Sequence, residues 1–142
     1  KKWNIKKYIK LAEEINKIKL CKFYLAGGKN DEELFKKFIN SSVGGSCISF
    51  EDLSIQETLP IIKNCDFYIG NDTGWLHIAS ALNVKCLALF MDSPVQAYGK
   101  YSKNISVIVP DGETEVSTTH GTSGKDRINF DQVLKKSLEL LS

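Results

Sequence analysis

Residues 65–82, CDFYIGNDTGWLHIASAL, indicate the fold of this chain more clearly than any other stretch. The apolar run at 67–69 predicts a buried strand, and the small residues at 78–82 predict a helix. A Gly-Asn-Asp-Thr-Gly turn joins the two, so it lies at the N-terminus of that helix. Such an end has unpaired N–H donors and a partial positive charge, which suit an anionic group such as a phosphate. We therefore expect an anion site formed by Asp72, Thr73, Gly74 and His77.

Length and composition predict one globular domain over residues 1–142. The chain has 142 residues, of which 42% are hydrophobic and 25% charged, as is ordinary for a soluble protein. That length is large enough for a single core. No run of about 18 apolar residues occurs, and the lysine-rich start lacks the apolar stretch of a signal peptide. The sequence therefore predicts no membrane span.

Charge and cysteine usage exclude several kinds of site. A net charge of +2 is too small to predict nucleic-acid binding. Eight lysines fall within residues 1–22, and they fit either the solvated face of a helix or weak attraction to an anionic membrane, at about 1 kcal/mol per cation. The four cysteines are widely spaced without a Cys-x-x-Cys pair, so we expect buried free thiols in a reducing compartment.

Apolar spacing predicts helices and strands that alternate along the chain. Helices are expected at 4–19, 31–40, after residue 54, at 78–82 and at 130–141, and strands at 23–26, 46–49, 67–69, 85–90 and 105–109. Ser54 and Glu57 have the spacing of a capping box, in which each side chain accepts from the backbone of the other. Pro60 is too deep for the first turn of that helix, so we expect a kink or an early stop, with the helix interrupted or ended around residues 60–64. Residues 111–125 are expected to form a loop.

This order, α-β-α-β-α-β-α-β-β-α, predicts an α/β fold: a Rossmann-like parallel sheet with helices on both faces. Ligands of such sheets bind beyond the carboxyl ends of the strands. The loops expected there are 27–31, 50–53, 70–74 and 91–103. A doubly wound domain normally opens on a strand, whereas this chain opens on a helix, so we expect a strand to precede it.

Three landmarks occur in order along the chain. Lys1-Lys2-Trp3-Asn4 precedes an amphipathic helix, and Leu25-Ala26-Gly27-Gly28 precedes acids at 31–33. Asn71-Asp72-Thr73-Gly74 is followed by His77 and by alternate alanines. Together they resemble the Lys-x-Trp-Pro opening, the strand–Gly-Gly–acidic element and the Asn-Asp-[Ser/Thr]-Gly-x-x-His core of the heptosyltransferases, glycosyltransferase family 9. The resemblance is to the C-terminal domain of that family and covers nearly all of the chain.

The resemblance implies the C-terminal half of a GT-B glycosyltransferase, in which two Rossmann-like domains face each other across a cleft. Such an enzyme moves heptose, with inversion, from an ADP-sugar to a lipopolysaccharide core acceptor without a metal or other cofactor. The nucleotide-sugar, expected to be ADP-heptose, is thus a substrate. The acceptor domain, with the general base and the first strand, would precede Lys1, and the lipid-linked saccharide acceptor would bind there. A cytoplasmic location is implied, and peripheral contact with the inner membrane stays open.

Carried over residue by residue, the resemblance implies a diphosphate site. Lys1 would contact the donor phosphates, and Thr73 and Gly74 at the helix N-terminus would bind the diphosphate with His77 beside it. Asp72 would lie near the sugar or fix the loop. Asp72 and His77 are thus candidates to support the chemistry, while no catalytic residue or metal ligand is assigned. From the residues alone, Asp72 could equally be an ordinary N-cap and His77 a packed or surface histidine.

The nucleoside would lie against a second group of residues. Asp31 or Glu32 would reach the ribose, and Leu53 would lie against the adenine. Gly27-Gly28 could also be a simple tight turn, because it is too short for a dinucleotide fingerprint. Met91-Asp92-Ser93-Pro94 departs from the Gly-Pro-Thr-like turn of the family, which leaves the donor sugar open.

Two other kinds of function are alternatives. A non-catalytic nucleotide or nucleotide-sugar binding module would need the same site, so only a transfer assay separates it from an enzyme. An unrelated sheet-based hydrolase is disfavoured, since neither a Gly-x-Ser-x-Gly elbow nor a P-loop occurs.

Overall fold

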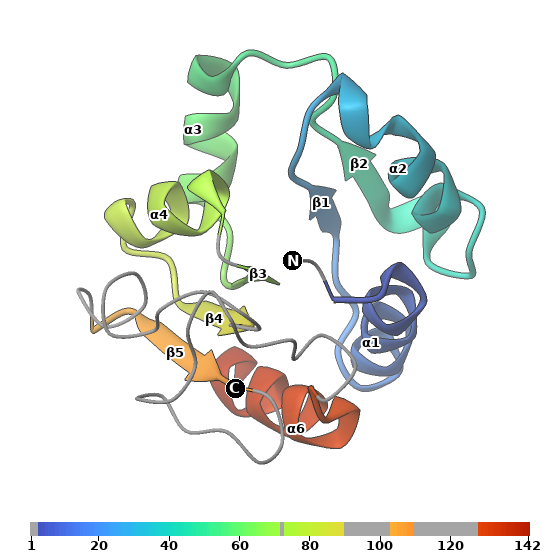
Figure 1. The fold of residues 1–142 in the computed structure, drawn as a ribbon, viewed down its shortest axis with the longest axis vertical. Helices are drawn as coiled ribbons and strands as arrows, with labels where there is room; N and C mark the ends of the chain where they lie inside the picture. The colour runs from blue at the N-terminus through green and yellow to red at the C-terminus, as the bar shows by residue number, and fades with distance from the viewer. Residues whose placement is uncertain (1–2, 72, 90–102, 110–127) are drawn as a thin grey trace. The chain divides into compact units, whose positions relative to one another are not determined.

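The computed structural model describes residues 3–71, 73–89, 103–109 and 128–142, and within them the expected order of helices and strands is confirmed (Figure 1). In chain order the elements are α1 (Ile5–Ile18), β1 (Phe23–Leu25), η1 (Lys29–Asp31), α2 (Glu32–Ile39), η2 (Gly44–Ser46), β2 (Cys47–Ser49), α3 (Ile55–Lys63), β3 (Tyr68–Asn71), α4 (Gly74–Ala81), β4 (Cys86–Leu89), β5 (Ile105–Ile108) and α6 (Phe130–Leu141). Residues 111–125, expected as a loop, lie outside the described ranges.

All strand pairs in the described ranges are parallel, as expected, and they form two ladders. β1 pairs with β2, with Phe23 opposite Cys47, and the second ladder has the order β3-β4-β5. The chain divides into two compact units: an N-terminal unit of Ile5–Ile61, and a C-terminal unit of Ile62–Ser142 with Lys1–Asn4. The fold is mixed α/β, with parallel sheets flanked by helices.

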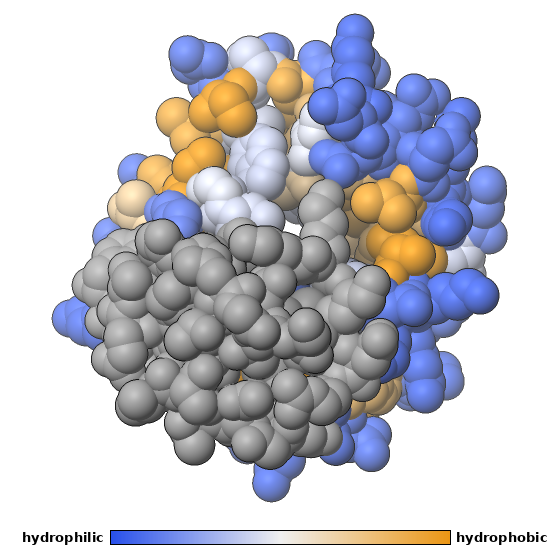
Figure 2. Space-filling model, viewed as in Figure 1, coloured by the Kyte–Doolittle hydropathy of each residue, from blue (hydrophilic) through white to orange (hydrophobic). Residues whose placement is uncertain are grey.

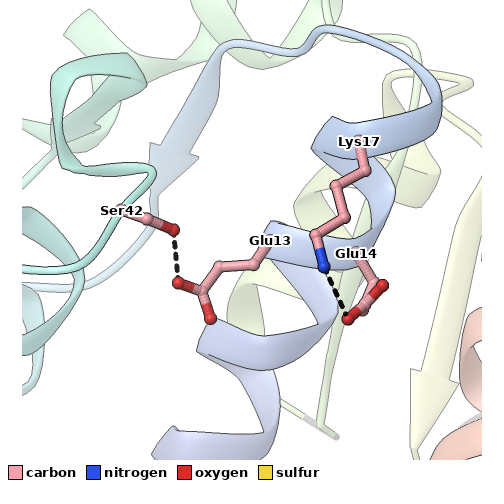
Figure 3. A network of polar contacts seen from close by, with 4 residues as sticks. All are labelled: Glu13, Glu14, Lys17 and Ser42. Carbon is pink, nitrogen blue, oxygen red and sulfur yellow. Dashed lines mark hydrogen bonds and ion pairs between the residues drawn. The ribbon is translucent and has the colours of Figure 1, made fainter.

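In the N-terminal unit, one face of helix α1 is buried, and the polar face carries a hydrogen bond to another segment of the unit. Leu11, Ala12 and Ile15 recur at helical spacing and are at most 6% exposed, so they form its core face. On the polar side, the hydroxyl of Ser42 donates a hydrogen bond to the carboxylate of Glu13 (Figure 3). This bond joins α1 to the connection between α2 and β2.

Helix α3 begins at the capping box that the sequence predicts. The Ser54 N–H donates to Glu57 Oε1 at 3.0 Å, and the Glu57 N–H donates to Ser54 Oγ at 3.1 Å. The hydrogen bond from the Ser54 backbone, with a smaller one from its side chain, lowers the pKa of the Glu57 carboxyl. The helix passes through Pro60 and ends at Lys63, within the range of residues 60–64 in which the sequence predicts an interruption or an end. Ile62, two residues beyond Pro60, is 7% exposed.

Strand β4 is the centre of the C-terminal unit. Its four residues, Cys86 to Leu89, are at most 1% exposed, as a strand paired on both edges and covered on both faces must be. Burial raises the pKa of the Cys86 thiol to about 11. All four cysteines are free, as expected, but Cys86 alone among them is fully buried.

Strand β3 is less buried than its apolar sequence predicts. Tyr68 and Ile69 are half-buried, whereas Gly70 and Asn71 at its carboxyl end are buried. This strand has a ladder partner on one side, β4, so it forms the edge of the described ladder.

The side chain of Asn71 joins three segments of the C-terminal unit. Its Oδ1 accepts a hydrogen bond from the backbone N–H of Trp3 at 2.9 Å, and its Nδ2 donates to the carbonyl oxygen of Leu89 at 2.9 Å. Trp3 itself is 2% exposed, and its ring stacks on Phe130 with the centroids 6.1 Å apart. The amino-terminal segment, the end of β3, the end of β4 and the start of α6 are thereby held together.

Five large apolar side chains of the described residues are exposed, and all are in the N-terminal unit: Ile18, Leu20, Ile39, Ile48 and Ile55. Figure 2 shows hydrophobic side chains in small groups among hydrophilic ones on the visible face. Single exposed apolar residues are normal on protein surfaces. Across 3–71, 73–89, 103–109 and 128–142, no helix is both long and apolar enough to cross a bilayer.

We predict that Asn71→Ala lowers the free energy of unfolding by about 3 kcal/mol, because it leaves the buried N–H of Trp3 and the buried carbonyl of Leu89 unsatisfied, at about 1–3 kcal/mol each. Asn104→Ala is the matched control, since the Asn104 amide donates over 3.3 Å and 3.4 Å to more exposed acceptors. Urea unfolding of both variants measures the difference. An equal loss of stability in the two variants would contradict the bridging role of Asn71.

Candidate functional site

The N-terminus of α4 is the best-defined candidate site in the C-terminal unit. Thr73 occupies the N-cap position in an extended conformation, and Gly74 is the first helical residue. Asp72 lies outside the described residues.

The hydroxyl of Thr73 does not cap its own helix. An N-cap threonine ordinarily accepts from a backbone N–H of the first turn, but here no side-chain cap bond forms. The Leu76 N–H is instead bonded to the Thr73 carbonyl oxygen at 3.1 Å. The first-turn N–H donors of α4 thus receive no hydrogen bond from the Thr73 side chain.

Among the described residues, nothing crowds the place where a side chain on Gly74 would lie. A Cβ built on it meets no described atom within 4 Å beyond its neighbours and its own helix, and its backbone is not left-handed. The residue is also exposed. Neither crowding nor backbone conformation among the described residues requires glycine here, so the position is suited to close approach of a ligand to the backbone.

The fold places this end of α4 at the carboxyl edge of the second ladder. Asn71 and Leu89 are register partners at the last positions of β3 and β4, and α4 follows directly from β3. At its other end, Asn83 has a left-handed φ of 64°, and the Val84 N–H bonds to the Ala79 carbonyl at 3.1 Å, as in a Schellman motif. Both ends of α4 are thus fixed, and its positive end faces the edge where ligands of parallel sheets bind.

Of the residues predicted for the diphosphate site, the structure brings three together. Thr73 and Gly74 form the start of α4. His77 is three residues after Gly74, so the two lie on the same face of the helix. His77 is half-buried. Lys1 and Asp72 lie outside the described residues. So do residues 91–94, the turn whose departure from the family pattern leaves the identity of the donor sugar open.

The other predicted residues lie in the N-terminal unit. β1 is followed by Gly27 and Gly28, and the Gly28 N–H donates to Asp31 Oδ2 at 3.1 Å. A Cβ on Gly27 would lie 2.5 Å from that same oxygen and 2.7 Å from Phe35 Cζ. The turn therefore needs glycine at 27 for close approach, and the Asp31 carboxylate braces it.

Glu32 and Leu53 are placed differently from Asp31. Glu32 begins α2 and pairs with Lys36 at 3.2 Å; its hydrogen bond is the main cause of the raised pKa of Lys36. Leu53 is half-buried and precedes the capping box of α3. Its N–H donates to the Phe50 carbonyl at 2.9 Å, so its position is set by a turn.

Sequence reasoning missed two residues beside this site. Asn71 was read only as part of a motif, although an amide directly after an apolar strand is a signal for a buried side-chain bridge. Tyr68 was read as a buried strand residue, yet its hydroxyl lies 3.5 Å from Thr73 Oγ1. Nothing in the sequence pattern indicated that contact. In the part of the chain that the structure describes, no group of three metal-ligating side chains gathers.

Comparison with protein families gives one match over most of the chain. Residues 1–125 match glycosyltransferase family 9 (heptosyltransferase). Lipopolysaccharide heptosyltransferase 1 of Campylobacter coli is 33% identical over 67 residues, which cover 47% of this chain and 19% of that relative.

Solved structures share the fold. An E. coli ADP-heptose lipopolysaccharide heptosyltransferase II has a TM-score of 0.80 at 22% identity, covering 98% of this chain and 41% of its own. The E. coli heptosyltransferase WaaC with ADP has a TM-score of 0.78 at 16% identity, with 97% and 39% covered. A family 9 glycosyltransferase from Veillonella parvula has a TM-score of 0.81 at 19% identity, with 98% and 41% covered. The chain thus spans about two fifths of these structures.

We predict that Gly27→Ala lowers the free energy of unfolding by about 1–3 kcal/mol, because its Cβ overpacks against Asp31 and Phe35. Gly28→Ala is the matched control: its Cβ would meet no described atom within 4 Å, and its φ of −119° suits any residue. We expect Gly28→Ala to change stability by less than about 0.5 kcal/mol. Thermal or urea unfolding separates the two, and a tolerated Gly27→Ala would contradict the close approach at this turn.

Proposed function

This chain belongs to glycosyltransferase family 9, the heptosyltransferases, and from that premise we propose that it is the donor-binding half of an inverting glycosyltransferase. In the proposed reaction, heptose or a similar sugar moves from an ADP-sugar to a lipopolysaccharide core acceptor. One of the structural relatives carries ADP. That relative supports an adenine nucleotide as the ligand to test first.

The observation that carries this proposal is the N-terminus of α4, where the Thr73 side chain makes no cap hydrogen bond. Gly74 is exposed, and a Cβ on it would meet no described atom within 4 Å. A diphosphate there would accept hydrogen bonds from the Gly74 N–H and the Thr73 hydroxyl, and it would be stabilised by the positive end of the helix. These groups fit an anion better than a neutral ligand.

The chemistry of an inverting transfer fits this arrangement. The bond from the anomeric carbon of the sugar to the diphosphate oxygen breaks as the acceptor hydroxyl attacks from the opposite face, so negative charge develops on the leaving diphosphate. Backbone N–H groups already aimed at that charge stabilise it without reorganising, and such donors are each worth about 3 kcal/mol in a water-excluded site. His77, one turn further along α4, would donate beside them, and Lys1 would add a cation.

We propose that Asp31 or Glu32 binds the ribose hydroxyls and that Leu53 lies against the adenine. Asp31 is fixed by its bond to Gly28, so its carboxylate is pre-oriented. Asp72 is proposed to lie near the sugar, where its charge is kept from the phosphates.

The remaining parts of the reaction are proposed to lie elsewhere in the protein. The acceptor domain and the general base would belong to a preceding α/β domain, together with the binding site of the lipid-linked saccharide. We propose a cytoplasmic enzyme that works without a metal or other cofactor and touches the inner face of the inner membrane at its periphery. Nucleic acid is not expected as a partner.

A non-catalytic nucleotide-binding module is the second candidate, because it would use the same helix end. Transfer from ADP-heptose to a lipopolysaccharide core acceptor, assayed with the intact protein, separates the two. ADP binding without any transfer would favour the module.

We predict that Gly74→Ala raises the melting temperature of the ligand-free protein and weakens ADP binding about tenfold or more. Alanine is favoured over glycine in a helix by up to about 1 kcal/mol, which stabilises the free protein. The added Cβ occupies the space that the diphosphate needs. Isothermal titration with ADP and thermal unfolding of the same samples measure both effects.

Gly45→Ala is the matched control, because Gly45 is exposed and its Cβ also meets no described atom within 4 Å. It should leave ADP affinity unchanged. If Gly74→Ala binds ADP as tightly as the wild type, the diphosphate does not contact this helix end, and the proposal fails.

A further inference from the structure

Tyr68 lies along the strand that leads into the site. Side chains two residues apart point to the same face of a strand, so Tyr68 and Gly70 share one face of β3. A Cβ on Gly70 would lie 2.5 Å from the Tyr68 hydroxyl oxygen, 3.0 Å from Cζ and 3.2 Å from Cε1. The tyrosine ring therefore lies directly over Gly70 and extends toward the carboxyl end of the strand.

This path brings the phenol to the N-cap of α4. The Tyr68 hydroxyl oxygen is 3.5 Å from Thr73 Oγ1, and either oxygen can be the donor. That separation is at the long end for a hydrogen bond, where O–H···O bonds normally measure about 2.7–2.8 Å. Each hydroxyl constrains the other only weakly, so a single acceptor placed near both can attract both protons.

We propose that Tyr68 is a ligand-binding residue whose phenolic hydroxyl donates a hydrogen bond to the same phosphate group that Thr73 binds. This inference rests on the proposed function, since it adds a donor to the diphosphate site at the start of α4. A phenol supplies a proton without a net charge, and its rigid ring sets the position of that proton. Gly70 leaves the room that the ring occupies.

A purely packing role for Tyr68 makes different predictions. If the ring only fills space over Gly70, removal of the hydroxyl changes neither ligand affinity nor the way phosphate is recognised. If the hydroxyl binds phosphate, its removal lowers ADP affinity while the ring continues to pack. The substitution Tyr68→Phe separates the two roles, because it deletes one oxygen and keeps the ring.

The test is isothermal titration of the intact protein with ADP, combined with thermal unfolding of the ligand-free samples. We expect Tyr68→Phe to weaken ADP binding about tenfold, the effect of losing one hydrogen bond to a charged group, with a melting temperature close to that of the wild type. Tyr8→Phe is the control: Tyr8 is also half-buried, but it lies on α1. The Tyr8→Phe variant should bind ADP with the affinity of the wild type.

A double-mutant cycle checks the position of the phenol. Gly70→Ala keeps the hydroxyl but pushes the end of the ring away from its place, so it should also weaken ADP binding. In the Tyr68→Phe background no hydroxyl remains to be displaced, and Gly70→Ala should then cause little further loss. This non-additivity is the signature of two substitutions that act through one group.

If the wild type binds ADP and Tyr68→Phe binds it with the same affinity, the role of Tyr68 is overturned and the proposed function stands. Additive losses in the cycle also overturn it, because Gly70→Ala would then act independently of the phenol. A folded wild-type protein that does not bind ADP overturns both this inference and the proposed function.

Discussion

The two hydrogen bonds of the Asn71 side chain are the constraint on which the C-terminal unit depends. They bind the backbone of Trp3 on one side and the last carbonyl of β4 on the other, each at 2.9 Å and away from solvent. Because a buried amide is costly unless its donor and acceptor are both satisfied, this arrangement admits few alternatives. It fixes the point at which β3 ends, and the chain then has only residues 72 and 73 before α4 begins.

That short connection determines what the helix end presents. Thr73 reaches the N-cap in an extended conformation with its hydroxyl turned toward Tyr68 rather than toward its own helix. Gly74 then exposes backbone instead of a side chain. At this helix end the fold positions a backbone N–H and a hydroxyl, which suit a ligand that brings its own negative charge.

The sequence was sufficient for features that depend on local chemistry. Helical spacing located α1 and α6, and the Ser54–Glu57 capping box appears with both bonds formed. Features that depend on tertiary packing could not be read in the same way. The burial of the Asn71 side chain between Trp3 and Leu89 joins segments far apart in the sequence, which residue spacing alone does not bring together. The contact of Tyr68 with Thr73 depends on a ring direction that strand periodicity does not encode.

The central claim is that the positive end of α4 holds the diphosphate of a nucleotide-sugar. A crystal structure of the intact protein with ADP tests it most directly. We predict diphosphate oxygens at about 3 Å from the backbone nitrogen of Gly74 and from the Thr73 hydroxyl, the distance of an ordinary hydrogen bond. A diphosphate bound away from this helix end, with the Gly74 N–H facing solvent, would contradict the claim.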